Sequence, residues 1–163
     1  MGLDRENIPL AERMRPKSLD FYLGQTHLVG TGSILRRAAE NANLPSMIFW
    51  GPPGVGKTTL ARILAKKTNL PFHQLSAINS GVKEVREIIA RAKSGGMFAG
   101  KAIIFIDEIH RFSKSQQDSL LGTVEQGHVV LIGATTENPS FEVIPALRSR
   151  CQIYVLNHLS HDD

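Results

Sequence analysis

The fold is decided by the stretch Gly51-Pro52-Pro53-Gly54-Val55-Gly56-Lys57-Thr58. It matches the pattern G-x-x-x-x-G-K-[ST], and it lies between a short apolar run at 46–50 and a segment of helical apolar spacing at 58–67. A strand, a glycine-rich turn and a helix in this order cradle phosphate, because the glycines let successive backbone N–H groups point at phosphate oxygens. The stretch therefore predicts a nucleoside triphosphate site rather than an incidental Gly/Pro turn.

The residues of this loop have separate expected roles. Lys57 is expected to place a positive charge on the β- and γ-phosphates, and the Thr58 hydroxyl is expected to be a ligand of Mg²⁺. The residues that we expect to bind the nucleotide are Pro53, Gly54, Val55, Gly56, Lys57, Thr58 and Thr59. The loop alone does not indicate what the energy of the triphosphate is used for.

Two acidic residues follow the most apolar strand of the chain, which is expected at 103–106. Ligands of parallel sheets sit outside the carboxyl ends of the strands, so Asp107 is expected to hold Mg²⁺ together with Thr58. Glu108 is expected to polarise a water for in-line attack on the γ-phosphate. A solvated strand end is the alternative. A second acid beside the metal ligand favours hydrolysis over phosphate transfer by a small-molecule kinase.

Strand and helix signals alternate along the rest of the chain, which predicts a parallel sheet covered on both faces. We expect an α/β fold, a three-layer αβα P-loop domain around a five-stranded parallel sheet. The expected strands lie at 46–50, 71–75, 103–106, 128–133 and 152–156, and the expected helices at 33–41, 58–67, 82–93 and 113–125.

The composition excludes several classes of protein. The chain has 163 residues, of which 42% are hydrophobic and 21% charged, which is typical of a globular domain with a core. No stretch approaches the roughly 20 apolar residues that span a bilayer, so no membrane association is expected. The single cysteine, Cys151, cannot form an internal disulfide, which makes the cytoplasm the expected compartment. The net charge of +4 allows a polyanionic partner without requiring one.

Four segments together resemble the AAA+ ATPases of the clamp-loader group. They are the phosphate loop, the pair Asp107-Glu108, the stretch Gly133-Ala134-Thr135-Thr136 and the triplet Ser149-Arg150-Cys151. Within that group, the long segments 107–118 and 132–142 closely resemble the family of replication-associated recombination protein A and its eukaryotic relative, the Werner-helicase-interacting protein. The similarity runs from about Pro9 to Leu159.

The resemblance implies two further catalytic residues. Thr136 is expected to end the fourth strand at the sensor 1 position, where it would hydrogen-bond the γ-phosphate or the attacking water. Arg150 is expected to be the arginine finger that reaches the ATP site of a neighbouring subunit, with Arg148 as a nearby competitor. The alternatives are a threonine that satisfies a local turn and an arginine in a surface ion pair.

The resemblance also implies a domain organisation. Residues 1–24 are an extended lead-in, in which Tyr22 and Leu23 would line the adenine pocket, although a plain core role fits them nearly as well. Residues 25–163 form the nucleotide-binding core. The helical lid and the C-terminal oligomerisation region of the family are expected outside these 163 residues. We therefore expect Mg²⁺-dependent ATP hydrolysis that is slow in this chain alone.

Partners follow from the same resemblance. The family places DNA at the centre of a ring of subunits, so we expect segment 110–116 to contact single-stranded or gapped DNA without reading its sequence. A homo-oligomer is expected in the full-length protein, and single-strand-binding protein and replisome components are possible partners. The expected function is a DNA-dependent ATPase of replication-fork maintenance, recombination and repair. Two alternatives are a nucleotide-dependent assembly switch without remodelling activity and a P-loop kinase.

Overall fold

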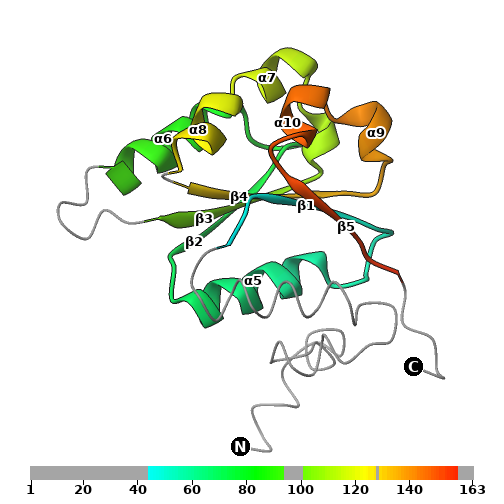
Figure 1. Ribbon diagram of the computed structural model, residues 1–163, viewed down its shortest axis with the longest axis horizontal. Helices are drawn as coiled ribbons and strands as arrows, with labels where there is room; N and C mark the ends of the chain where they lie inside the picture. Colours follow the sequence, from blue (N-terminus) through cyan, green and yellow to red (C-terminus); the bar gives the residue numbers. More distant parts are fainter. Residues whose placement is uncertain (1–43, 94–100, 128, 158–163) are drawn as a thin grey trace, which may run out of the picture.

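A computed structural model describes residues 44–93, 101–127 and 129–157 of the chain (Figure 1). The helix expected at 33–41 and the lead-in at 1–24 lie outside these residues. In chain order the elements are β1 (Met47–Trp50), α5 (Lys57–Thr68), β2 (Phe72–Ser76), α6 (Val82–Lys93), β3 (Ala102–Asp107), η3 (Ile109–Arg111), α7 (Lys114–Asp118), α8 (Leu121–Gln126), β4 (Val129–Thr135), α9 (Pro139–Glu142), α10 (Pro145–Arg148) and β5 (Gln152–Val155).

The five strands form one parallel sheet in the order β2-β3-β4-β1-β5. Helix α5 covers one face, and α6, α7, α8 and α10 lie over the other (Figure 1). All strands end at the same edge because they are parallel, so the segments that follow β1, β3 and β4 are neighbours in space. The expected fold, a three-layer P-loop domain with a five-stranded parallel sheet, is confirmed.

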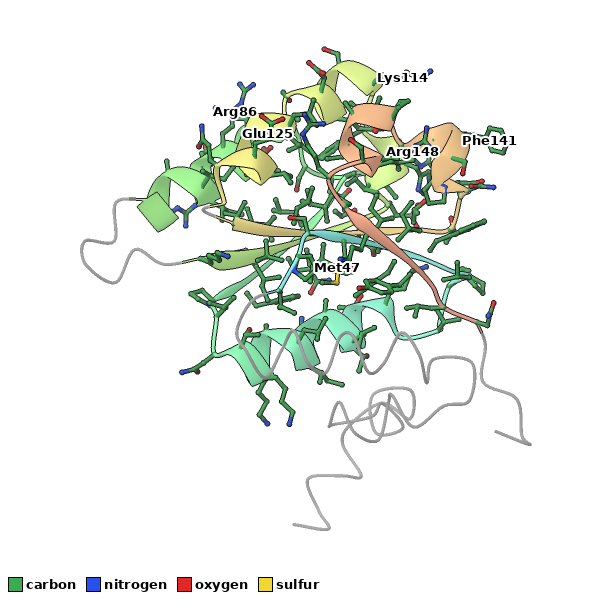
Figure 2. All side chains as sticks on the ribbon, in the orientation of Figure 1. Met47, Arg86, Lys114, Glu125, Phe141 and Arg148 are labelled. Carbon is green, nitrogen blue, oxygen red and sulfur yellow. The ribbon has the colours of Figure 1, made fainter. Side chains whose placement is uncertain are left out.

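Two apolar layers hold the sheet between its helices, because successive strand residues point to opposite faces. On one face of the sheet, Phe49 and Phe105 pack in one cluster with Leu60 and Leu64 of α5. On the other face, Ile48 belongs to a cluster that includes residues of α6. Met47 lies between the sheet and α5 (Figure 2). Full burial of one such side chain contributes about 1.5–3 kcal/mol relative to exposure, so this packing is what fixes the strand ends in place.

The central strands β3 and β4 are buried almost throughout, but the edge strands are not. Ile153 and Val155 of β5 are exposed on one face, while Tyr154 packs on Phe49 with ring centroids 6.3 Å apart. The sheet is thus covered on both faces, but its edge strands β2 and β5 are less buried than its centre. Each of them has a neighbouring strand on one side only.

The helix expected at 113–125 is interrupted and forms α7 and α8 instead. The Ser119 hydroxyl donates to the Gln116 carbonyl at 2.6 Å, and Leu120 turns into the core with 1% of its surface exposed. The buried Gln117 side chain donates to the carbonyls of Phe112 and Glu142, at 3.1 and 2.9 Å. At the break, the Leu120 N–H donates to the Gln117 carbonyl, three residues back, at 3.0 Å, so the expected single helix is two short ones.

Candidate functional site

The phosphate loop has the backbone that its sequence predicts. Gly54 and Gly56 adopt φ angles of 82° and 92°, in the left-handed region that favours glycine. Gly56 is the N-cap of α5 and supplies no side-chain hydrogen bond, and the first turn of the helix holds no acidic residue. The positive end of this 12-residue helix is thus left without an anionic side chain of its own. This geometry fits the phosphates of a nucleotide.

Gly51 anchors the start of the loop between two neighbouring strands. Its N–H donates to the Thr135 carbonyl at 3.1 Å, and the Leu156 N–H donates to the Trp50 carbonyl at 2.8 Å. A Cβ atom at position 51 would lie 2.3 Å from the Leu156 carbonyl oxygen. The close approach of the chain after β5 therefore requires glycine at this position.

Lys57 is buried at the centre of the site. Its ammonium donates to the Gly51 carbonyl at 2.5 Å and to the Pro52 carbonyl at 3.3 Å. Burial lowers the pKa of Lys57, whereas the nearby carboxylates of Asp107 and Glu108 raise it. The lysine that follows β1 and the acids at the end of β3 therefore interact electrostatically.

The residues next to Lys57 differ in their surroundings. Thr58 is half-buried, whereas Thr59 is buried and its hydroxyl has no hydrogen-bond partner within the described part of the chain. A buried hydroxyl without a partner is destabilising, so a phosphate oxygen is a suitable ligand for it. Val55 packs into the core beneath the loop, while Pro53 is exposed at its tip.

The acidic pair lies at the carboxyl end of β3. Asp107 is the last residue of the strand, and its Oδ1 accepts the Glu108 N–H at 3.0 Å. Glu108 has a φ of 57°, in the left-handed region that residues other than glycine rarely adopt. Such backbone conformations cluster at functional sites. The turn directs the Glu108 side chain towards His110, whose Nε2 lies 3.2 Å from Glu108 Oε2.

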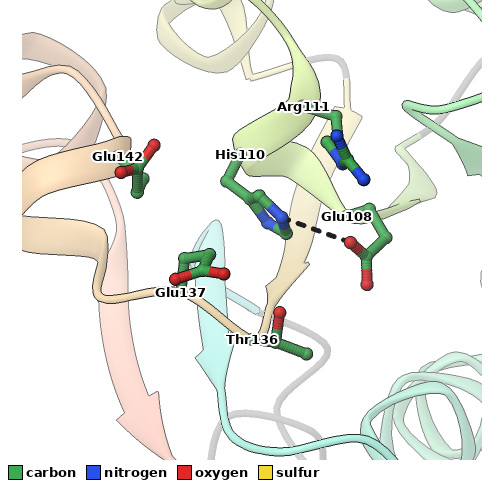
Figure 3. A pocket seen from close by; sticks show the side chains of 6 residues that line it. All are labelled: Glu108, His110, Arg111, Thr136, Glu137 and Glu142. Carbon is green, nitrogen blue, oxygen red and sulfur yellow. Dashed lines mark ion pairs between the residues drawn. The ribbon is translucent and has the colours of Figure 1, made fainter.

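A cavity of about 690 Å³ opens beside the acidic pair (Figure 3). Its lining consists of Glu108, His110, Arg111, Thr136, Glu137 and Glu142. The expectation that Thr136 ends the fourth strand is wrong, because β4 ends at Thr135 and Thr136 is the next residue. The strand end nevertheless brings Thr136 to the same cavity as Glu108, which is the association that the resemblance implied.

The sequence analysis did not foresee a contact between Thr135 and His110, and it assigned His110 only to the segment expected to contact DNA. Thr135 is 1% exposed, and its Oγ1 lies 2.8 Å from Nδ1 of His110. His110 thereby bridges Thr135 and Glu108. A histidine two positions after a strand-end glutamate is the only sequence signal, and it does not reveal the threonine 25 residues away.

Arg150 lies at the other edge of the sheet, just before β5. Its Nε forms an ion pair with Glu125 Oε1 at 2.5 Å, and one terminal nitrogen donates to the Ala146 carbonyl at 2.7 Å. Arg148 donates from Nε to the Val143 carbonyl at 3.0 Å. Because the length of the strands separates this edge from the phosphate loop, the structure does not bring Arg150 to the site of its own chain.

The structure describes only some of the residues that the sequence analysis expected to bind adenine or DNA. Tyr22 and Leu23 lie outside the described residues. In segment 110–116, His110 and Phe112 point inward, whereas Arg111 and Lys114 are exposed. Ser113 and Gln116 form a capping box, in which the Gln116 N–H donates to Ser113 Oγ at 3.1 Å. The Gln116 N–H at the start of α7 is therefore already paired within this chain.

A comparison with known protein families identifies the family to which this fold belongs. Residues 47–159 match the family model described as "ATPase family associated with various cellular activities (AAA)". The chain belongs to the AAA family of ATPases, and nucleotide binding and ATPase activity are general properties of that family. Across the described ranges, no helix is both long enough and apolar enough to span a membrane.

Particular relatives narrow the resemblance. The chain is 55% identical over 152 residues to replication-associated recombination protein A of Haemophilus influenzae, covering 93% of this chain and 34% of that protein. It is 48% identical over 155 residues to ATPase WRNIP1 of Dictyostelium discoideum, covering 95% of this chain and 18% of the relative. The resemblance to this family is thereby confirmed. The chain spans about a third of the length of the bacterial relatives that it matches.

Solved structures show the same fold. The Thermotoga maritima RuvB Holliday junction branch migration motor superposes with a TM-score of 0.69 at 33% identity, covering 88% of this chain and 48% of that chain. A P216G mutant of the same protein superposes with a TM-score of 0.71 at 31% identity, covering 90% of this chain and 50% of that chain.

Proposed function

We propose that this chain is the ATP-binding and ATP-hydrolysing core of a DNA-dependent ATPase that acts in replication-fork maintenance, recombination and repair. One observation carries the proposal: the carboxylates of Asp107 and Glu108 interact with the buried Lys57 of the phosphate loop, and Thr136 lines the same cavity as Glu108. The names of the relatives support the process in which the activity is used.

Phosphate binding is assigned to residues Pro53 to Thr59. The loop N–H groups and the uncapped start of α5 would hold the phosphate oxygens, and Lys57 would leave its carbonyl partners to contact the β- and γ-phosphates. The Thr59 hydroxyl would gain the partner that it lacks among the described residues.

Hydrolysis is assigned to the acidic pair and the residue after β4. Thr58 and Asp107 offer hydroxyl and carboxylate oxygens, which suit Mg²⁺, and the bound ion would neutralise charge on the phosphates. Glu108 would accept a proton from the attacking water. Thr136 lines the same cavity and would hydrogen-bond the γ-phosphate or that water.

Arg150 would act on a neighbouring copy of the chain. It lies at the edge of the sheet opposite the phosphate loop, so it cannot complete the site from which its own chain hydrolyses ATP. An arginine supplied in trans stabilises transition-state charge and contributes strongly to turnover. We therefore expect a homo-oligomer in the full-length protein and slow hydrolysis by the 163-residue chain alone.

DNA contact is assigned to the exposed cations that follow the acidic pair, Arg111 and Lys114. Both can pair with phosphates, and neither is part of a base-reading pattern, so binding would be independent of sequence and would weaken as salt is raised. Single-stranded and gapped DNA are the forms that we expect to bind.

The test is ATP turnover of the full-length protein, with and without single-stranded and gapped DNA. We expect Mg²⁺-dependent turnover that DNA stimulates. A Glu108→Gln variant should bind ATP and DNA but lose turnover. Turnover that no DNA changes would contradict the proposed function. DNA association that follows ATP binding, with no remodelling of DNA by the wild type, would favour the assembly switch.

A further inference from the structure

The short helix η3, which directly follows the acidic pair, packs against the neighbouring strand β4. Gly133 makes this contact possible, because a Cβ at position 133 would lie 2.8 Å from Cδ1 of Ile109. Ile109 is completely buried there, and the next residue, His110, is delivered to the end of β4 with 10% of its side chain exposed. The packing of Ile109 on Gly133 therefore restricts the position of His110.

His110 uses both ring nitrogens. Nε2 lies 3.2 Å from Glu108 Oε2, and Nδ1 lies 2.8 Å from Thr135 Oγ1. The Thr135 Oγ1 also accepts the Glu137 N–H at 2.9 Å. With a neutral imidazole protonated on Nε2, every link has one donor and one acceptor: Glu137 N–H to Thr135, Thr135 O–H to His110, and His110 N–H to Glu108.

This series of hydrogen bonds includes both neighbours of Thr136, the residue proposed to contact the γ-phosphate or the attacking water. Thr136 lies between Thr135 and Glu137, and both of these neighbours belong to the series. Thr136 and Glu108 line the same cavity (Figure 3). A displacement of the turn at Thr136 would therefore move Thr135 and, through the imidazole, the Glu108 carboxylate.

We propose that His110 is a positioning residue, which holds the carboxylate of Glu108 and couples it to the turn that carries Thr136. The inference rests on the proposed function, in which Glu108 activates the attacking water. A rotatable carboxylate that is fixed by one N–H donor needs less reorganisation before reaction than a free one, and misplacement of a reacting group by about 1 Å can lower a rate 100-fold.

A purely structural role explains less. Burial of the Thr135 hydroxyl does not require the histidine, because the hydroxyl also lies 3.1 Å from the Glu137 carbonyl oxygen, to which it could donate. Nor does Glu108 need a partner for burial, since its side chain is 28% exposed. Neither the Thr135 hydroxyl nor the Glu108 carboxylate therefore requires His110 as a partner, but His110 is the residue that connects them.

Two substitutions separate the two contacts in the full-length protein. His110→Gln places an amide near the Nε2 position and can still donate to Glu108, whereas His110→Asn can reach only Thr135. We expect kcat to fall on the order of tenfold to 100-fold in His110→Asn and in His110→Ala, and by less than about threefold in His110→Gln. The KM for ATP should change less than about twofold in all three, since no phosphate contact is removed.

A matched control is His73→Gln in β2, far along the chain from the acidic pair, which should leave kcat unchanged. Equal kcat values for wild type and His110→Ala would overturn the inference, as would a rise in KM without a change in kcat. A lower melting temperature with unchanged kcat would assign His110 a structural role alone. A wild type without ATP turnover would instead contradict the proposed function.

A second readout does not depend on turnover. In ¹⁵N-histidine spectra of the 163-residue chain, we expect the two ring nitrogens of His110 to give distinct resonances, with the proton on Nε2 facing the Glu108 carboxylate. Glu108→Ala should shift the Nε2 resonance, and Thr135→Val should shift the Nδ1 resonance, with Thr135→Ser as the control that keeps the hydroxyl. Averaged tautomers, like those of a solvated histidine, would overturn the inference whether or not ATP is hydrolysed.

Discussion

The sheet has two edges where its strands begin and end, and the polar groups at these two edges differ in how completely they are paired. At the carboxyl edge, Glu108 has a left-handed backbone, the Thr59 hydroxyl has no partner within the described ranges, and Lys57 is buried on backbone carbonyls. At the opposite edge, Arg150 is already paired with Glu125 and the Ala146 carbonyl. Polar groups that are strained or incompletely paired can gain from a ligand, whereas paired groups on a surface need none. The difference supports the proposal that nucleotide binds at the carboxyl ends of the strands.

The largest effect is expected from Glu108→Gln. The amide keeps the size of the side chain but cannot accept a proton from water, so turnover should fall by about 10²- to 10⁴-fold while ATP binding is kept. Steady-state hydrolysis together with a fluorescent-nucleotide titration measures the two separately. Glu87→Gln, on the exposed side of α6, is the control. Unchanged turnover would mean that Glu108, at the carboxyl edge, is not a catalytic residue.

Lys57→Ala should weaken ATP binding by about 100-fold, which is about 2.8 kcal/mol, because a charge-assisted contact to phosphate is lost. The free energy of unfolding should fall by no more than about 1 kcal/mol, because burial already disfavours the charged lysine, as its lowered pKa indicates.

Titration calorimetry measures this loss of binding, and Lys66→Ala, on the exposed side of the same helix, is the matched control. Equal losses in Lys57→Ala and Lys66→Ala would mean that the general charge of α5, rather than the loop, attracts the nucleotide.

Gly51→Ala should destabilise the fold by about 1–3 kcal/mol, since the new Cβ would lie 2.3 Å from a backbone oxygen that cannot move easily. Gly122→Ala in α8 is the control. It adds a Cβ with no atom within 4 Å and should be neutral or stabilise by up to about 1 kcal/mol. Denaturant unfolding of the 163-residue chain compares the two. Equal stabilities would show that the chain after β5 does not approach the loop closely.

The smallest effect is expected at the opposite edge. Glu125→Gln removes the carboxylate of an ion pair whose side chains are 39% and 50% exposed, so the free energy of unfolding should change by less than about 1 kcal/mol. Thermal unfolding at low and high salt measures the change. A loss well above 1 kcal/mol would mean that the ion pair of Arg150 with Glu125 stabilises the fold. Arg150 would then be a structural residue rather than one that is free to act on another subunit.

The prediction from sequence succeeded where the signal is local. The phosphate loop, the apolar strand before Asp107 and the helix 82–93 depend on neighbouring residues, and all three have the expected structure. It failed where a distant contact intervenes. The helix expected at 113–125 is two short helices beside the buried Gln117 and Leu120, and the fourth strand continues to Thr135, where it pairs with Trp50 of β1.

By itself, the sequence determined the class of fold, the phosphate loop and the acids that follow the third strand, because glycine conformations and apolar periodicity act over a few residues. Only the tertiary structure decided that His110 joins Glu108 to Thr135 and that Arg150 is paired with Glu125. Each of the contacts His110–Thr135 and Arg150–Glu125 links residues 25 positions apart. No local pattern encodes such pairs, because they depend on which strands lie side by side and in which register.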